Sequence, residues 1–242
     1  METINLLPFS AAIVTFVFTG MVLQRYFFRP SLHLLFWTLG LGMYGLATFA
    51  EAFLAVSWSP LAFQLWYLCG AVLTAAWLGQ GTIFLLVRKR RLSYTLMGLL
   101  LAGSLFALVT MLTTPLNAAA YSPAQSLTAT YKAILPEGAL IRMLTPFFNI
   151  YGTLGLVGGA LYSAWLFWRK RVLPHRMVGN VLIAIGGMSP ALGGTMARLN
   201  LSEFLYVSEL LGAVVMLAGF VVASSPDLVR RPAQTRRAEP AT

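Results

Sequence analysis

The fold is decided by the hairpin Trp37–Leu86, WTLGLGMYGLATFAEAFLAVSWSPLAFQLWYLCGAVLTAAWLGQGTIFLL. Its two apolar segments flank the turn Trp58-Ser59-Pro60. Each segment is long enough to cross a bilayer core about 30 Å thick, which needs about 20 residues of helix. Glu51 lies inside the first segment. A carboxylate within a bilayer costs at least ~2.5–3.5 kcal/mol on insertion scales, so this position requires a partner or a function.

The composition of the whole chain extends this pattern. Of the 242 residues, 58% are hydrophobic and 10% are charged, whereas a soluble domain has about 45–50% apolar and about 25% charged residues. We therefore expect an all-α membrane protein, a seven-helix bundle. The net charge of +10 does not indicate nucleic-acid binding, because the basic residues lie in short loops between apolar segments. The expected spans lie near 5–25, 31–56, 60–87, 93–113, 143–168, 177–197 and 203–224.

The basic residues also predict the orientation of the bundle. Fourteen of the 17 Lys and Arg residues lie after the first, third and fifth spans or in the C-terminal tail. The opposite side has only Lys132, Arg142 and Arg198. Because basic residues stay on the cytoplasmic side, we expect the N-terminus outside and the C-terminus in the cytoplasm. The expected location is a bacterial cytoplasmic membrane, with a seven-helix domain at 1–225 and a disordered basic tail at 226–242.

The outer segment at 114–142 is longer and more polar than a plain connector. Ser122-Pro123 predicts the start of a short helix that reaches Leu135 and ends at Pro136-Glu137-Gly138. This helix is either a lid over the outer mouth of the bundle or a passive segment in the membrane interface.

The first three and the last three spans share one orientation and some sequence. The segment 68–72, LCGAV, resembles 210–214, LLGAV, and Pro-Phe pairs occur at Pro8 and Pro146. This pattern predicts a 3+1+3 parallel repeat, which is a transporter design. Chance similarity between apolar segments is the alternative.

The sixth span contains GGMSPALGG at 186–194. Pro190 lacks an amide donor and clashes with the preceding turn, so we expect a kink or helix break there, with Gly187 and Gly193 on either side. Broken helices line ligand cavities in transporters. Small residues also allow close helix packing, and the sequence leaves both interpretations open.

No catalytic residue, metal or cofactor is expected. His33 and His175 both lie at the cytoplasmic edge, and Cys69 is the one cysteine, so no set of metal ligands converges. No span pairs a nucleophile with an acid–base residue. The seventh span has no lysine for a retinal Schiff base. We therefore expect a protein that is not an enzyme.

Polar side chains from several spans are expected at one depth in the outer half. Glu51 lies about five residues from the outer end of the second span and Glu209 about seven residues into the seventh. At 1.5 Å per residue, both are roughly 8–10 Å below the outer boundary. The candidate ligand-binding residues are Glu51, Tyr67, Arg142, Asn149, Arg198 and Glu209.

Two interpretations of this polar layer compete. In the structural one, Arg142 pairs with Glu51, and Arg198 pairs with Glu209 or Glu203, in contacts of a kind that averages about 0.6 kcal/mol. In the functional one, the carboxylates bind a cation, a proton or a polar head group. The aromatic residues near the outer ends, Trp66 and Tyr206 among them, are typical of an interfacial belt.

The hairpin also resembles known proteins. A basic loop, Trp37 and a small-residue helix with Glu51 are followed by WYLCGA at 66–71 and WLGQGT at 77–82. This pattern resembles a group of uncharacterised bacterial seven-helix proteins and, more distantly, the seven-helix sensor regions fused to some bacterial histidine kinases. The resemblance covers about a quarter of the chain, contains no catalytic motif and implies sensing or ligand binding.

Two function hypotheses follow. In the first, the protein binds or translocates a small molecule or ion of unknown identity through the polar layer. In the second, it is a receptor-like or accessory subunit that acts through a membrane protein partner or as a homo-oligomer. We expect signalling to need a separate partner, because the sequence contains no kinase or cyclase domain.

Overall fold

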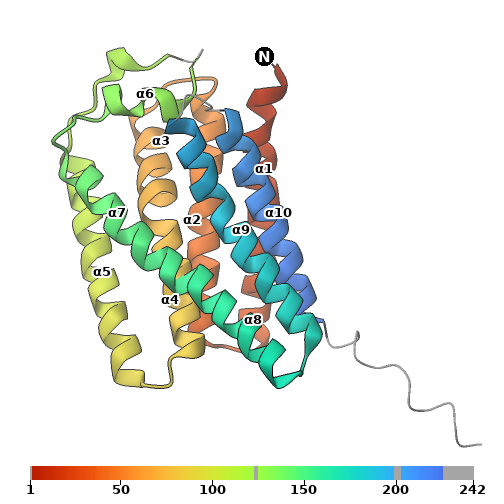
Figure 1. Ribbon diagram of the computed structural model, residues 1–242. Coiled ribbons are helices and arrows are strands. Elements are labelled where there is room, and N and C mark those ends of the chain that lie inside the picture. Colours follow the sequence, from red (N-terminus) through yellow and green to blue (C-terminus); the bar gives the residue numbers. More distant parts are fainter. Residues whose placement is uncertain (1, 123–124, 199–202, 226–242) are drawn as a thin grey trace, which may run out of the picture.

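The computed structural model describes residues 2–122, 125–198 and 203–225, which form a bundle of helices without strands (Figure 1). Within these residues, seven helices are long and apolar enough to cross a membrane. The all-α prediction and the number of helices of membrane-spanning length are confirmed. The predicted disordered tail at 226–242 lies outside the described residues.

The bounds of the helices agree with the predicted spans to within three residues. In chain order, the seven long helices are α1 (Glu2–Phe28), α2 (Leu32–Leu54), the third helix composed of α3 (Pro60–Leu65), η1 (Trp66–Leu73) and α4 (Thr74–Leu86), α5 (Arg90–Thr113), the fifth helix composed of α7 (Leu140–Thr153), η3 (Leu154–Gly158) and α8 (Gly159–Lys170), α9 (Pro174–Arg198) and α10 (Glu203–Ser224). The short elements η2 (Ala118–Ala120) and α6 (Leu127–Ile134) lie between α5 and α7.

The two ends of the bundle differ in character. At one end, called the α6 end here, α6 and the turn between α2 and α3 lie over the helices (Figure 1). Ser59 begins α3 there, because its Oγ accepts a hydrogen bond from the amide of Ala62 at 3.3 Å and Pro60 occupies the first helical position. The opposite end, called the basic end, carries the loops at 87–89 and 171–173. The predicted short helix is therefore present as α6, although it begins at Leu127.

Two of the long helices contain π-helical segments, η1 and η3. The hydroxyl of Thr74, the first residue of α4, donates to the carbonyl of Cys69 in η1 at 2.8 Å. The side-chain amide of Asn149, on α7, donates to the carbonyl of Ala71 at 2.8 Å. A π-helical turn widens the helix and often lies at a functional site, and η1 begins at Trp66, beside α2.

The predicted helix break in the sixth span is not present. The α-helix α9 continues through Pro190 from Pro174 to Arg198. The nearby glycines instead allow α9 to pack closely on α10. A Cβ added at Gly193 would lie 2.7 Å from the Cβ of Ser208. On another face of α9, a Cβ at Gly187 would lie 3.1 Å from a side-chain carbon of Leu156 in η3. Packing, rather than a ligand cavity, explains this glycine-rich segment.

Close backbone contact also joins the third and fifth helices. A Cβ added at Gly79 would lie 2.8 Å from the carbonyl oxygen of Gly152, and one at Gly152 would lie 2.5 Å from the amide nitrogen of Ala76. The two backbones therefore touch. This contact places Asn149, one turn before Gly152, against η1.

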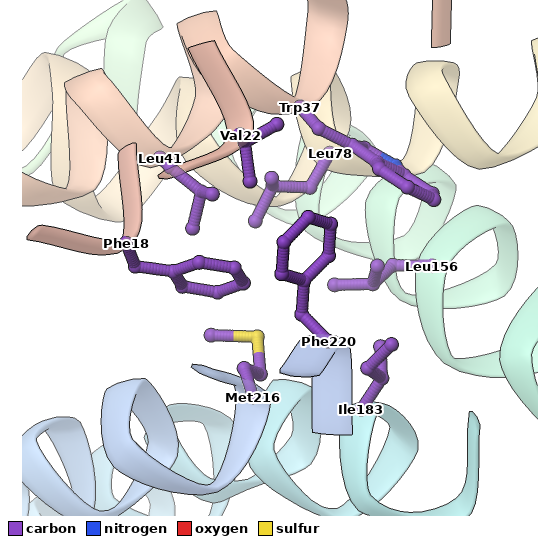
Figure 2. Close-up of a pocket in the computed structure, with 9 residues that line it drawn as sticks. All are labelled: Phe18, Val22, Trp37, Leu41, Leu78, Leu156, Ile183, Met216 and Phe220. Carbon is purple, nitrogen blue, oxygen red and sulfur yellow. The ribbon is translucent and has the colours of Figure 1, made fainter. Parts of the chain in front are cut away.

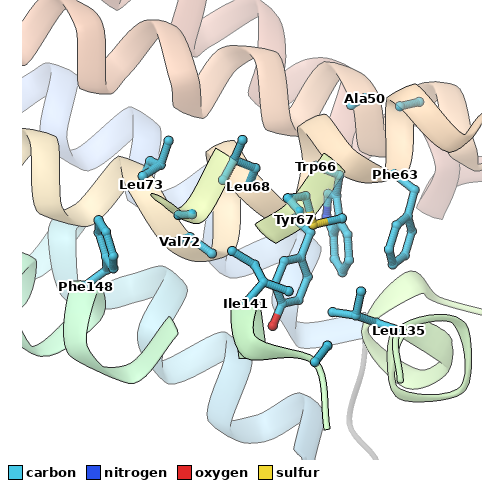
Figure 3. Close-up of a cluster of buried hydrophobic side chains, with 14 of the residues drawn as sticks. Ala50, Phe63, Trp66, Tyr67, Leu68, Val72, Leu73, Leu135, Ile141 and Phe148 are labelled. Carbon is cyan, nitrogen blue, oxygen red and sulfur yellow. The ribbon is translucent and has the colours of Figure 1, made fainter. Parts of the chain in front are cut away.

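The buried side chains form two main groups along the bundle. The larger group lies toward the α6 end, where α3, η1, α6 and α7 meet around Phe63, Tyr67 and Ile141 (Figure 3). The second group lies between α1, α2 and α10 and includes Phe18, Leu41 and Phe220. The helix α5 lies at the edge of the bundle in Figure 1.

Candidate functional site

Two carboxyl groups from distant parts of the chain meet near the α6 end. Glu51 lies one turn before the end of α2, and Glu209 lies in the second turn of α10. Their carboxyl groups are within hydrogen-bonding reach of each other. The structure therefore brings together the two acidic residues that depth alone had grouped. We call Glu51 and Glu209 the carboxyl pair.

The carboxyl pair is largely buried, and three of its four oxygens lack a hydrogen-bond donor among the described residues. The Glu51 side chain is 2% exposed, and Glu209 is partly buried. Among the described residues, no donor completes a hydrogen bond to either oxygen of Glu51 or to Oε2 of Glu209. Two ionised carboxylates have no hydrogen to offer each other. A single proton between them would supply the missing O–H···O bond.

Three aromatic side chains with polar edges surround the carboxyl pair. The hydroxyl of Tyr44, two turns before Glu51 on α2, donates to the backbone carbonyl of Glu209 at 2.8 Å. Tyr206 lies close enough to both carboxyl groups for electrostatic interaction. The indole N–H of Trp66 lies near the Glu51 carboxyl group, outside the geometry of a full hydrogen bond.

These three aromatic residues were not among the predicted site residues. The sequence pattern places Trp66 and Tyr206 in an interfacial belt and predicts no role for Tyr44. A signal for Tyr44 was present, because it lies seven residues before Glu51, and residues seven apart share one face of a helix. Tyr206 likewise lies three residues before Glu209. Its side chain also reaches the backbone of Leu127, at the start of α6.

Tyr67 and Asn149 hold the fifth helix against η1. The hydroxyls of Tyr67 and Thr145 are 3.2 Å apart, and Figure 3 shows the Tyr67 hydroxyl beside Ile141 of α7. The Asn149 amide donates to the carbonyls of Ala71 and Thr145, at 2.8 and 3.1 Å. These contacts give both residues a structural role beside the carboxyl pair.

The predicted pairing of Arg142 with Glu51 is wrong. The guanidinium group of Arg142 donates to the carbonyl of Leu135 at 3.3 Å, and it lies 6.0 Å from the centre of the Tyr131 ring. The reason is local, since the chain folds back between α6 and α7 and offers Arg142 the free carbonyl at the end of α6. The predicted pairing of Arg198 with Glu209 or Glu203 depends on a side chain that the structure does not describe.

Few side chains of the kind that bind metal ions lie near the carboxyl pair among the described residues. Across the described residues, no three His, Cys, Asp or Glu side chains come together. The carboxyl pair would therefore offer a metal ion at most two carboxylates. Monovalent cations need fewer charged ligands than the divalent ions that proteins hold with several oxygen ligands.

A cavity of about 40 Å³ lies on the other side of Tyr44, toward the basic end. Figure 2 shows its lining, which is entirely apolar or aromatic and comes from six segments of the chain. Leu41 lies one turn from Tyr44 on the same helix, and Met216 lies two turns from Glu209. The cavity and the carboxyl pair are therefore arranged one below the other along α2 and α10.

No family model matches the chain, and no curated protein and no solved structure matches it either. The functional argument therefore rests on the carboxyl pair and its surroundings.

Proposed function

We propose that the protein is an integral membrane protein that binds a small cation between Glu51 and Glu209 and translocates it. The observation that carries this proposal is the Glu51 carboxyl group, which is 2% exposed, has no described donor on either oxygen and faces a second carboxyl group. Like charges in apolar surroundings repel strongly, and intramembrane ionisable residues are functional candidates by default. A bound cation removes this repulsion.

The proton is the cation that fits the geometry without movement. One proton between the two carboxyl groups makes an O–H···O⁻ bond, and hydrogen bonds to an ionised group are short and about twice as strong as neutral ones. A larger cation has to push the carboxyl groups apart and displace Tyr206 or Trp66. We therefore take the proton as the first ligand to test and monovalent metal ions as the second.

The proposal includes an orientation. Basic residues at the basic end support an N-terminus outside the cell and a C-terminus in the cytoplasm, so that the carboxyl pair lies in the outer half of a bacterial cytoplasmic membrane. The contact of Tyr206 with Leu127 supports a lid role for α6, since α6 and the carboxyl pair share this side chain. A 3+1+3 repeat belongs to the same proposal and is supported by the sequence matches at 68–72 and 210–214.

A second candidate is a receptor-like or accessory subunit, in keeping with the resemblance to bacterial sensor regions. The cavity on the far side of Tyr44 favours this candidate, because the lining of the cavity is apolar and offers an ion no ligand. In this candidate, proton binding changes the packing of α2 on α10 without transport. A membrane partner or a second copy of the chain then detects that change.

Proton flux into liposomes tests the proposal. The purified protein is reconstituted with an internal pH dye, and a potassium diffusion potential drives protons inward. We expect flux in the wild type, at least a tenfold loss in Glu51→Gln, and no change in Glu137→Gln, whose carboxyl group lies exposed in the loop before α7. Glutamine keeps the size and hydrogen-bonding capacity of Glu51 but cannot release a proton.

The outcomes separate the two candidates. Absence of flux in the wild type, together with a pH-dependent thermal unfolding that Glu51→Gln removes, favours the receptor-like candidate. Equal behaviour of the wild type and Glu51→Gln in both measurements contradicts cation binding at the carboxyl pair altogether.

A further inference from the structure

The apolar cavity has a cationic group directly beside its wall. Phe220 of α10 forms part of the lining, and its ring points into the cavity in Figure 2. The guanidinium carbon of Arg25, on α1, lies 5.6 Å from the centre of this ring. Arg25 also donates a hydrogen bond to the Ser224 hydroxyl. Among the described residues, Arg25 has no carboxylate partner, so its charge is open to an anion.

A second basic side chain adjoins the lining on α2. The imidazole ring of His33 packs edge-on against Trp37, with ring centres 5.4 Å apart, and Trp37 lines the cavity. His33 and Arg25 are near enough to interact electrostatically. The two basic side chains therefore lie at the same end of the cavity.

Arg25 and the apolar lining lie at successive depths, in the same order as the head group and the tail of an amphiphile in a membrane. Arg25 lies in the last turn of α1, and the lining residues Val22 and Phe18 lie about one and two turns deeper on the same helix. A charged head group at Arg25 would therefore continue into hydrocarbon at the level of the cavity. Of the lining side chains, only Trp37 and Ile183 are partly exposed, whereas the others are buried. The mouth of the cavity thus lies between α2 and α9.

We propose that this cavity binds the hydrocarbon end of an anionic amphiphile whose head group is held by Arg25. The space of about 40 Å³ has room for roughly three water-sized groups. It therefore accepts the terminal methylenes of a chain, while the remainder passes between Trp37 and Ile183. Guanidinium groups bind carboxylates and phosphates through paired N–H donors, which makes an anion the complementary head group. A fatty acid anion and an anionic phospholipid share this chemistry.

Tryptophan quenching in nanodiscs tests the proposal. The full chain is placed in phosphatidylcholine nanodiscs, and decanoate brominated near its chain end is added, since bromine quenches an indole that it contacts. The Trp37 contribution is the difference between the wild type and Trp37→Phe. We expect saturable quenching of Trp37. Arg25→Gln should weaken the apparent affinity about tenfold, the loss typical of a hydrogen bond to a charged group. Arg29→Gln, an exposed arginine one turn later, serves as the matched control.

Further probes separate head group and source. Brominated decanol, with the same chain and no charge, should bind at least tenfold more weakly than decanoate. Brominated-chain phosphatidylglycerol is then built into the nanodiscs, with brominated phosphatidylcholine as control. Selective quenching of Trp37 by phosphatidylglycerol identifies the phospholipid as the ligand, and quenching by decanoate alone identifies the free acid. In an otherwise wild-type background, Ile183→Phe should narrow the mouth and reduce quenching by either ligand.

Three results would overturn the proposal. The first is equal quenching of the wild type and Trp37→Phe, which places the probe elsewhere. The second is an equal effect of Arg25→Gln and Arg29→Gln, and the third is equal affinity for decanol and decanoate. Each result is independent of proton binding at the carboxyl pair, which lies in the other half of the bundle.

Discussion

The backbone contact between the third and fifth helices leads to a prediction for Gly152→Ala. The added methyl carbon would lie 2.5 Å from the amide nitrogen of Ala76 and closer still to the carbonyl group of Ala75. Both are backbone atoms, so no side chain can rotate to make room, and the two helices must separate. Overpacking of this kind costs about 1–3 kcal/mol. The better helix propensity of alanine returns about 1 kcal/mol, which leaves a net loss of about 0–2 kcal/mol, so that Gly152→Ala should be about 1–3 kcal/mol less stable than a variant that gains the propensity without the clash.

The control is Gly98→Ala in α5, where an added Cβ meets nothing within 4 Å. This variant receives the same gain in helix propensity without the clash, so it should be neutral or up to about 1 kcal/mol more stable. Reversible unfolding in mixed micelles, followed by tryptophan fluorescence, gives the free energy of unfolding of each variant. Equal stabilities of Gly152→Ala and Gly98→Ala would refute the backbone contact and the placement of α7 that follows from it.

Three further predictions concern single contacts near the carboxyl pair. Asn149→Ala should lower the free energy of unfolding by about 1 kcal/mol, because it removes the hydrogen bond to the partly buried carbonyl of Ala71; an unchanged value would contradict the role of Asn149 at η1. Tyr44→Phe should cost about 1 kcal/mol in the same measurement through loss of the bond to Glu209, and a stabilised variant would count against that bond. Arg142→Gln should speed proteolytic cleavage between α6 and α7 without changing proton flux; a loss of flux would restore the predicted link to the carboxyl pair.

The spans were predictable because length and apolarity suffice to define a membrane helix. The grouping of Glu51 with Glu209 followed from counting residues from the helix ends, which fixes the depth of each carboxyl group. Depth does not fix rotation about the helix axis. In a helix that is apolar all round, no polar face indicates which side is inward. Within α2, only the seven-residue spacing between Tyr44 and Glu51 indicated a shared face.

The positions at which the helices break or become π-helical could not be predicted from the sequence, for a different reason. Pro190 predicted a break in α9, but the helix continues through it, because neighbouring helices can support a proline within a membrane helix. The π-helical segment η1 instead occurs where Thr74 and Asn149 satisfy its carbonyls. One of these donors comes from another helix, so the position of η1 depends on tertiary contacts that local sequence does not record.

The central claim is that Glu51 and Glu209 hold a proton between them. Infrared spectroscopy of the reconstituted protein at neutral pH measures this directly, because a protonated carboxyl group absorbs apart from carboxylate and amide groups. We predict a protonated-carboxyl band in the wild type and in Glu137→Gln that is lost in Glu51→Gln and altered in Glu209→Gln. A wild-type spectrum without that band, or a band that persists unchanged in both variants of the carboxyl pair, would contradict the account.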